Sequence, residues 1–367
     1  MKILAVDIGT GTQDILLFDT RTEVENCLQL VMPSPTVLVA EQIRAATARG
    51  QDLLLTGTIM GGGPDDWAAH DHLRAGYRVF ATPTAALTFN DDLDEVKRSG
   101  IEIVSPDELA GLTHAVRVTL RDFDLDAIRR AFGSFGVPLA FDALAVAVFD
   151  HGNAPPGMSD RLFRFEFLAE RIRAANKLSA FAFMREQVPD RLTRMKAVAD
   201  SLEIDKPVLL MDTAPAAVLG ALEDDRVRDH PTRLVVNVGN FHTLAFRFRD
   251  GSITGCFEHH SGELSDAQLE GFIGQLADST LTHDAIFNSQ GHGALLFDAQ
   301  PVPLDFVAVL GPKRGKLLHS RLQPYFAVPY GDMMLAGDYG LVRAYADLNP
   351  DSADEITRAL TNARALV

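Results

Sequence analysis

The chain has 367 residues, 47% of them hydrophobic and 23% charged, and its formal net charge is −16. This length predicts two domains of ordinary globular composition, and the negative charge argues against a nucleic-acid partner because phosphate backbones are bound by clustered lysines and arginines. Two distant cysteines and the lack of an uncharged run long enough to span a bilayer favour a cytoplasmic protein with no membrane association.

The first predicted element is a hairpin around a glycine-rich turn. An apolar run over residues 2–6 leads into residues 7–14, Asp-Ile-Gly-Thr-Gly-Thr-Gln-Asp, and a second apolar run follows. Gly9 and Gly11 allow the backbone to approach a ligand closely, and Thr10 and Thr12 offer hydroxyls to phosphate oxygens. Asp7, at the end of the first strand, is a candidate magnesium ligand.

Two other phosphate-binding motifs are excluded at this hairpin and elsewhere. A dinucleotide-binding unit needs a helix after its glycines, whereas a strand is predicted here. The stretch at residues 311–317 lacks the spacing and the Ser or Thr of a Walker A loop. A tight turn without a ligand is the remaining alternative for the hairpin.

After the hairpin we predict a third strand near residues 36–39, a helix over 41–48 and a strand over 52–55. The stretch from Thr56 to about Asp94 begins with glycines, including Gly61-Gly62-Gly63. We interpret it as an insertion at the mouth of a cleft that supplies substrate contacts, with a simple surface loop as an equal alternative.

The strand predicted over residues 143–149 is almost wholly apolar, as expected for a strand covered on both faces. Asp150 and His151 follow it, at the strand end where open α/β sheets bind ligands. Asp150 is a candidate general base, and the alternative is that it orders the turn or caps a helix. His151 is a candidate to orient Asp150 or to bond a substrate. Helices are predicted over 161–175 and 185–202.

A strand over residues 207–211 ends at Asp212, which is a candidate to contact magnesium or to cap the following helix. The pattern of the first hairpin then repeats over residues 233–248, with Asn237 in the position of Asp7 and Gly239 in that of Gly9. A third run over 252–260 completes a three-strand meander. Beyond it, Ser265 and Gln268 predict a capping box at the start of a helix that ends near 277.

These motifs, in this order, resemble the actin, Hsp70 and sugar kinase superfamily. The matching segments are residues 7–14, 212–220, 237–243, 306–312 and 333–341. The resemblance implies an α/β fold of two ribonuclease H-like (actin-like ATPase) domains that face each other across a nucleotide cleft. It places the first domain at residues 1–223, with an insertion around 56–140, and the second at 224–367.

The resemblance also implies ATP and Mg²⁺ as cofactors. The nucleotide-binding residues that it implies are Gly9, Thr10, Gly11, Thr12, Asp14, Asn237, Gly239, Asn240, Thr243, Gly311, Pro312 and Lys313. Asp7 and Asp212 are the implied metal contacts, and Asp7, Asp150 and His151 the candidate catalytic residues.

Within the superfamily, the chain resembles an archaeal and bacterial family labelled as related to pyruvate formate-lyase activating enzyme. A radical S-adenosylmethionine activase needs three closely spaced cysteines for its iron–sulfur cluster. Because the chain has only Cys27 and Cys256, that cluster chemistry is not available.

Two histidine-rich stretches invite a transition-metal hypothesis, residues 70–72 and residues 258–260. Neither has the ligand spacing of a zinc site, and adjacent histidines on a strand point to opposite faces. The spacing therefore argues against a transition-metal site in either stretch.

Three functions follow from these observations. The first is an ATP-dependent kinase or ATPase that acts on an unknown small molecule. The second is an ATP-responsive module that acts on a partner enzyme without turning over a small molecule, and the third is a relative that no longer binds nucleotide. Asn237 stands where the superfamily commonly has Asp, which weakens the case for turnover more than the case for binding.

Overall fold

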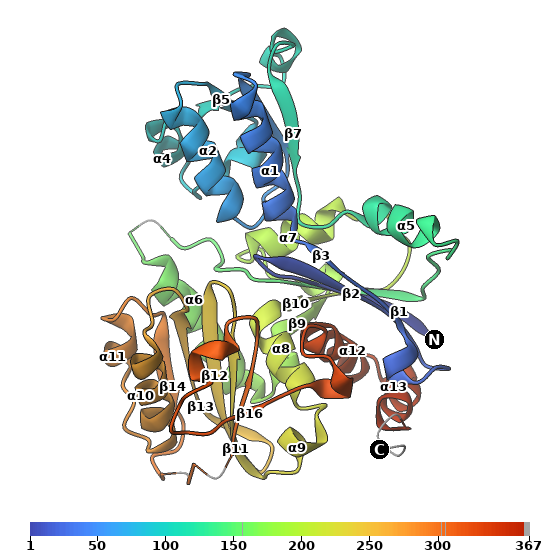
Figure 1. Ribbon diagram of the computed structural model, residues 1–367, viewed down its shortest axis with the longest axis vertical. Helices are drawn as coiled ribbons and strands as arrows, with labels where there is room; N and C mark the ends of the chain where they lie inside the picture. Colours follow the sequence, from blue (N-terminus) through green and yellow to red (C-terminus); the bar gives the residue numbers. More distant parts are fainter. Residues whose placement is uncertain (156, 302, 305, 363–367) are drawn as a thin grey trace.

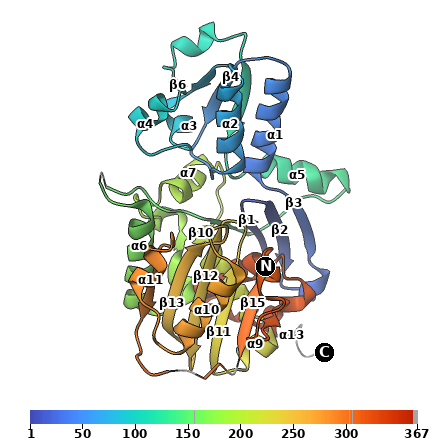
Figure 2. The ribbon, with the colours of Figure 1, turned by 60° about the vertical axis from the view of Figure 1, so that its left-hand side comes forward.

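The computed structural model describes residues 1–155, 157–301, 303–304 and 306–362. Two six-stranded sheets form its core, and Figures 1 and 2 show them as separate layers. The first sheet has the order β3 (Leu28–Pro33), β2 (Thr12–Asp19), β1 (Lys2–Ile8), β8 (Ala143–Val148), β10 (Val208–Asp212) and β9 (Ala182–Met184). The second has the order β14 (Gly293–Leu296), β13 (Ser252–His260), β12 (His242–Arg249), β11 (Thr232–Val238), β15 (Val307–Leu310) and β16 (Tyr325–Phe326).

Five strands of each sheet follow the same topology. In each sheet, three consecutive strands form an antiparallel meander, and two further strands add in parallel beside the first strand of that meander. The order β3-β2-β1-β8-β10 in the first sheet thus corresponds to β13-β12-β11-β15-β16 in the second. This is the ribonuclease H-like strand order. The predicted duplication and the fold of two-domain actin-like ATPases and sugar kinases are confirmed, whereas the exact division of the chain at residue 223 stays a prediction.

A third, smaller sheet lies apart from the other two, at the top of Figure 1. Its four parallel strands have the order β6 (Glu102–Ile103), β5 (Val79–Ala81), β4 (Leu53–Gly57) and β7 (Val116–Leu120). The helices of this small domain are α1 (Pro35–Ala48), α2 (Pro64–Arg74), α3 (Pro83–Ala86), α4 (Leu93–Arg98) and the 3-10 turn η2 (Glu108–Gly111). It has its own apolar core, so the predicted insertion is a folded unit and not a surface loop.

One prediction in this region is wrong. Residues 36–39 do not form the third strand but lie in the first turns of α1, and the third strand is β3. The β-branched residues there suggested a strand. However, Pro35 occupies the first helical position, which favours the start of a helix. Thr36, Val39 and Ala40 share one buried face of that helix, so packing against the rest of the small domain stabilises the helix.

The outer faces of the large sheets and the loops carry the remaining helices. On the first sheet these are η1 (Val24–Asn26), α5 (Leu125–Ser134), α6 (Asp160–Ala175), η3 (Leu178–Phe181), η4 (Arg185–Gln187) and α7 (Thr193–Ser201). In the second half they are α9 (Asp225–Arg228), α10 (Asp266–Ala277), α11 (His283–Phe287), η5 (Arg314–Leu317), η6 (Pro329–Gly331) and α13 (Pro350–Asn362). The helix predicted over 185–202 is two elements, and the capping box of Ser265 and Gln268 is confirmed.

Two helices, α8 (Thr213–Ala221) and α12 (Ala336–Leu348), pack against each other in the core that the two large sheets share. A Cβ atom on Gly220 would lie 1.7 Å from Ala336 O, and one on Gly340 would lie 1.9 Å from Ala216 O. Only glycine allows the two backbones to approach this closely. Two of the segments that match the superfamily, residues 212–220 and 333–341, overlap these two helices. Across the described residues, no helix has both the length and the apolar character needed to cross a bilayer.

Candidate functional site

The main cleft lies where the two hairpin turns meet the start of α12. It is lined from the first sheet by Asp7, Gly9, Thr10, Thr12 and Asp14, and from the second by Asn237, Gly239, Asn240, Phe241 and His242. Gly311, Pro312, Met333, Met334 and Gly337 line it as well. Ten of the residues that line the cleft are candidates that the sequence analysis named.

The two turns have the same backbone geometry. Gly9 N–H donates to Thr12 O at 2.9 Å, and Gly239 N–H donates to His242 O at 2.9 Å. A Cβ on Gly239 would lie 2.7 Å from that carbonyl oxygen, so a larger residue would distort the turn. A Cβ on Gly11 would lie 2.5 Å from Asn240 Nδ2, which shows that the turns touch each other. The repeated sequence motif thus builds two equivalent backbone bends on one cleft.

Three of the predicted nucleotide contacts, Gly11, Thr243 and Lys313, are not among the residues that line the cleft. Thr243 is buried and its Oγ1 lies 2.8 Å from the Ser261 hydroxyl. Lys313 donates its backbone N–H to Val238 O, which fixes the loop after β15 against the second turn. Gly311 in that loop has φ +94°, and a Cβ there would lie 2.5 Å from Val238 O. This loop needs glycine for its shape, as the motif suggested.

Three buried carboxylates lie close together beside the cleft, which two of them, Asp7 and Asp14, line. Asp7 ends β1 and accepts a hydrogen bond from Thr213 Oγ1, while Asp14 pairs with Asp7 in the β1–β2 register. Burial raises the pKa of Asp7 to about 7 and that of Asp14 to about 8, and the Asp7 charge adds to the second shift. Burial and these two neighbours also raise the pKa of Asp338 well above its ordinary value.

The carboxylate cluster fits a hydrated divalent cation. Asp14 Oδ1 and both carboxylate oxygens of Asp338 are buried without a hydrogen-bond partner among the described residues. Unpaired buried carboxylate oxygens are costly, and a bound cation removes that cost. Sequence reasoning missed Asp338, because only the assembled fold brings it to the other two acids. Gly337, the residue before it, packs directly against Asp7, since a Cβ there would lie 1.9 Å from Asp7 Oδ2.

The other two candidate carboxylates have structural partners. Asp150 accepts hydrogen bonds from Gly152 N–H and Met195 N–H, both at 2.8 Å, and so orders its turn and the start of α7. Asp212 caps α8 through Ala214 N–H and pairs with Arg164. Neither residue lines the main cleft. Asp212 therefore caps a helix and Asp150 orders a turn, which are the structural alternatives of the sequence analysis.

Arg164 is fully buried between two carboxylates, a feature that sequence reasoning missed. Its Nη2 donates to Asp212 Oδ1 at 3.1 Å and to Glu258 Oε1 at 3.0 Å, which joins β10 of the first sheet to β13 of the second. The two carboxylates hold the pKa of Arg164 above its ordinary value in spite of burial. One guanidinium between two carboxylates fixes how the two sheets meet at this point.

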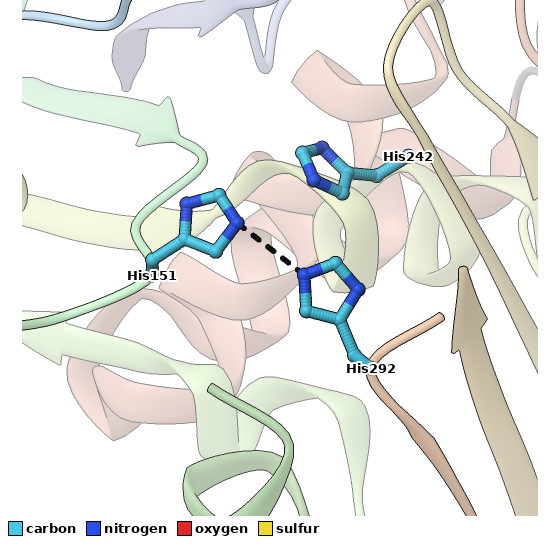
Figure 3. Close-up of side chains that lie close together, drawn as sticks. All are labelled: His151, His242 and His292. Atoms are coloured by element: carbon cyan, nitrogen blue, oxygen red, sulfur yellow. Dashed lines mark hydrogen bonds between the residues drawn. The ribbon is translucent and has the colours of Figure 1, made fainter. Parts of the chain in front are cut away.

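His151 lies next to two other histidines, His242 and His292, as Figure 3 shows. The ring nitrogens of His151, His242 and His292 lie within 4.8 Å of one another. Burial lowers the pKa of His151 to about 3 and lowers the pKa values of His242 and His292 as well, so all three imidazoles are neutral near pH 7. Because they come from three distant segments, no sequence spacing could reveal this cluster.

The glycine-rich loop of the small domain reaches the mouth of the main cleft. A Cβ on Gly63 would lie 2.5 Å from Phe241 and 3.6 Å from Thr10, one residue from each turn. Trp67, in α2, packs on Phe241 with ring centroids 5.5 Å apart. The loop therefore lies beside both turns, and its role in substrate contacts stays a prediction.

A family model described as "Putative pyruvate format-lyase activating enzyme (DUF1786)" matches residues 60–316, more than half of the chain. The chain belongs to this family. The family's description does not match the chemistry of this chain. Cys27, at the end of η1, and Cys256, in β13, are both buried, and the sequence has no third cysteine for a cluster. No curated protein matches the chain.

Several solved structures are similar at low identity. A ROK hexokinase from Thermus thermophilus is 13% identical, with 95% of this chain and 100% of the hexokinase covered and a TM-score of 0.31. The ethanolamine utilization protein EutJ from Carboxydothermus hydrogenoformans is 14% identical, with 93% and 89% covered and a TM-score of 0.29. A ROK family transcriptional regulator, a homologue of the E. coli MLC protein, is 10% identical over 69% of this chain, with a TM-score of 0.26. The matched part spans 37% of that regulator's length. The fold assignment rests on the strand orders above.

Proposed function

We propose that the main cleft binds ATP with Mg²⁺ and transfers its terminal phosphoryl group to a small molecule or to water. The observation that carries this proposal is the pair of equivalent glycine turns, which contact each other and line one cleft. Backbone N–H groups in such turns are suited to phosphate oxygens, and they bind without needing a positively charged surface. This agrees with the negative charge of the chain.

Asp7, Asp14 and Asp338 are the residues that would hold Mg²⁺, which is bound in proteins by few carboxylates and several waters. Their unpartnered oxygens support this assignment. When bound, the ion neutralises charge on the phosphates and orients them.

The chain's own residues would position the reactants and exclude water. The hydroxyls of Thr10 and Thr12 and the side chain of Asn240 would contact phosphate oxygens, while Gly311 and Pro312 would flank the nucleoside. Gly63 and Trp67 stand at the mouth, so the acceptor would enter beneath the small domain. Excluding water there would favour transfer to an acceptor over hydrolysis.

Isothermal titration calorimetry of the full chain with ATP, with and without Mg²⁺, tests the proposal. We expect one site per chain with an affinity that depends on Mg²⁺, and we expect Asp7→Ala to abolish that dependence. Thr22→Ala, outside the cleft, is the matched control. If the wild-type chain binds no nucleotide, the proposal is wrong.

One observation favours a second candidate, an ATP-responsive module that does not turn over a small molecule. Asp150, the candidate general base, and Asp212, the candidate magnesium contact, are both engaged in structural contacts. Measuring phosphate release and transfer across a metabolite panel separates the candidates. Binding without either reaction favours the module, and turnover favours the enzyme.

A further inference from the structure

The three histidines beside the cleft form a second feature that the nucleotide site does not use. His151 follows β8 of the first large sheet, whereas His242 begins β12 and His292 precedes β14 of the second. We propose that their ring nitrogens bind one divalent transition-metal ion of the zinc class, at the junction of the two large sheets.

The ligand geometry supports this assignment. His151 Nε2 lies 3.3 Å from His292 Nε2, and the three ring nitrogens lie within 4.8 Å of one another. Nitrogens that bind one tetrahedral zinc ion at about 2.0–2.1 Å lie about 3.3 Å apart. The His151–His292 pair already has this separation. The His242 ring would have to move by about 1–2 Å to bring its nitrogen to the same distance from the other two. Imidazole nitrogen is the ligand that zinc and similar ions prefer in such sites.

Two buried ring nitrogens in the cluster have no partner among the described residues, His242 Nε2 and His292 Nδ1. Histidines that serve only as packing in a core normally satisfy both nitrogens. His242 does stack on Phe149, with ring centroids 3.9 Å apart, but that contact leaves its Nε2 unused. A bound ion would account for the unused nitrogen of His242.

The surroundings resemble the outer shell of a metal site. Glu258 Oε2 lies 4.0 Å from His292 Nδ1, on the side of the ring away from His151, and Arg164 holds that carboxylate in place. Metal-binding histidines commonly donate their other N–H to a carboxylate.

The backbone also holds the ligands in place. A Cβ on Gly291 would lie 2.5 Å from His259, and one on Gly293 would lie 2.6 Å from His283 and Phe165, so His292 sits in a tightly packed segment. Arg161 donates to the carbonyl oxygen of Gly291 at 2.7 Å. Pre-organised ligands reduce the cost of binding an ion.

Three protein ligands leave a fourth coordination position. Phe149 and His242 line the main cleft, so the histidine cluster borders that cleft. His260 lies near the cluster, with its ring centroid 4.7 Å from that of His292, but it is not one of the three grouped nitrogens. An open position is typical of zinc sites that take water or a substrate oxygen.

The test is zinc and cobalt binding by the full chain after chelator treatment. We expect one Zn²⁺ per chain by calorimetry and the visible absorption bands of tetrahedral Co²⁺. His151→Gln and His292→Gln should each lower zinc affinity at least about 100-fold, and Glu258→Gln about tenfold. His319→Gln, on the exposed loop after η5, is the matched control and should bind zinc as the wild type does.

Two results would overturn the proposal. One is a wild-type chain that takes up neither ion, a result that does not depend on whether any variant folds. The other is unchanged zinc affinity in folded His151→Gln and His292→Gln proteins. His260→Gln should keep the ion, and its loss in a folded variant would contradict the open fourth position.

Discussion

At the scale of single residues, the central feature is a set of acids that are buried without a counter-charge. Asp338 is fully buried, and its two carboxylate oxygens have no partner in the described part of the chain. We predict that Asp338→Asn keeps or raises thermal stability, because it removes a buried acid, and lowers magnesium-dependent nucleotide affinity about tenfold or more. Thermal melting and calorimetry measure the two effects.

Asp347 offers a control on the same helix, since it is exposed on α12. Asp347→Asn should leave both quantities unchanged. If Asp338→Asn binds magnesium and nucleotide as tightly as the wild type, Asp338 is not part of the metal site.

A second buried acid makes stability depend on pH. Asp65, in α2, accepts a hydrogen bond from Thr36 Oγ1 at 2.7 Å, and burial raises its pKa to about 7. The pKa of Asp65 in the folded protein lies above its value in the unfolded chain. The stability that the protonated Asp65 carboxyl contributes is therefore fully present below about pH 4 and is lost as the pH rises through 7. Between pH 5 and 8 the loss is about 2 to 3 kcal/mol.

Asp65→Asn should remove this loss, because an amide does not titrate. Urea unfolding at pH 5 and pH 8 measures it through Trp67, the single tryptophan, which lies on the same helix. Asp71→Asn, exposed on that helix, should keep the wild-type pH dependence. Equal pH dependence in the wild type and in Asp65→Asn would show that Asp65 ionises normally.

At the scale of elements, the packing of α8 on α12 depends on two glycines. Gly340→Ala would place a Cβ 1.9 Å from Ala216 O, so the helices must move apart and the core that both sheets share must repack. We predict a melting temperature at least about 5 °C lower than that of the wild type.

Gly274→Ala in α10 is the matched control. A Cβ there meets nothing within 4 Å, and alanine is the better helix former, so stability should be unchanged or higher. A wild-type melting temperature for Gly340→Ala would mean that the two helices are packed less closely than described.

Many of the helices and strands could be predicted from the sequence, because short-range sequence motifs specify them. The strand–turn–strand repeat at Gly9 and Gly239 and the capping box at Ser265 are short-range patterns, and both were found. Residues 36–39 were assigned to a strand because β-branched composition is weaker evidence than the Ser-Pro helix start at residues 34–35. The parallel small sheet was missed, since its pairings join distant segments.

The same division applies to the candidate site. The turns could be predicted because each is contiguous in the chain, and they supply the lining of one cleft. Asp338 and the three histidines could not, because they become neighbours only when the two sheets and α12 are assembled. Asp150 and Asp212 were chosen as candidates because each lies at the end of a strand. That position does not reveal whether a carboxylate already accepts hydrogen bonds from backbone N–H groups, as Asp150 does, or pairs with an arginine, as Asp212 does with Arg164.

At the scale of the whole molecule, the small domain touches the second sheet's turn through Trp67 and Phe241. Because Phe241 also lines the main cleft, nucleotide binding should change the environment of Trp67. We predict a saturable change in tryptophan fluorescence on adding ATP with Mg²⁺. In Phe241→Leu the change should shrink while calorimetry still detects binding, and an unchanged signal in the wild type at saturation would contradict this coupling.

The most direct test of the account is a crystal structure of the full chain with Mg²⁺ and a nonhydrolysable ATP analogue. We predict that the phosphates lie between the turns at residues 9–12 and 239–240, with the Mg²⁺ ion beside Asp7, Asp14 and Asp338. A triphosphate bound elsewhere, or contacting only one of the turns, would contradict it.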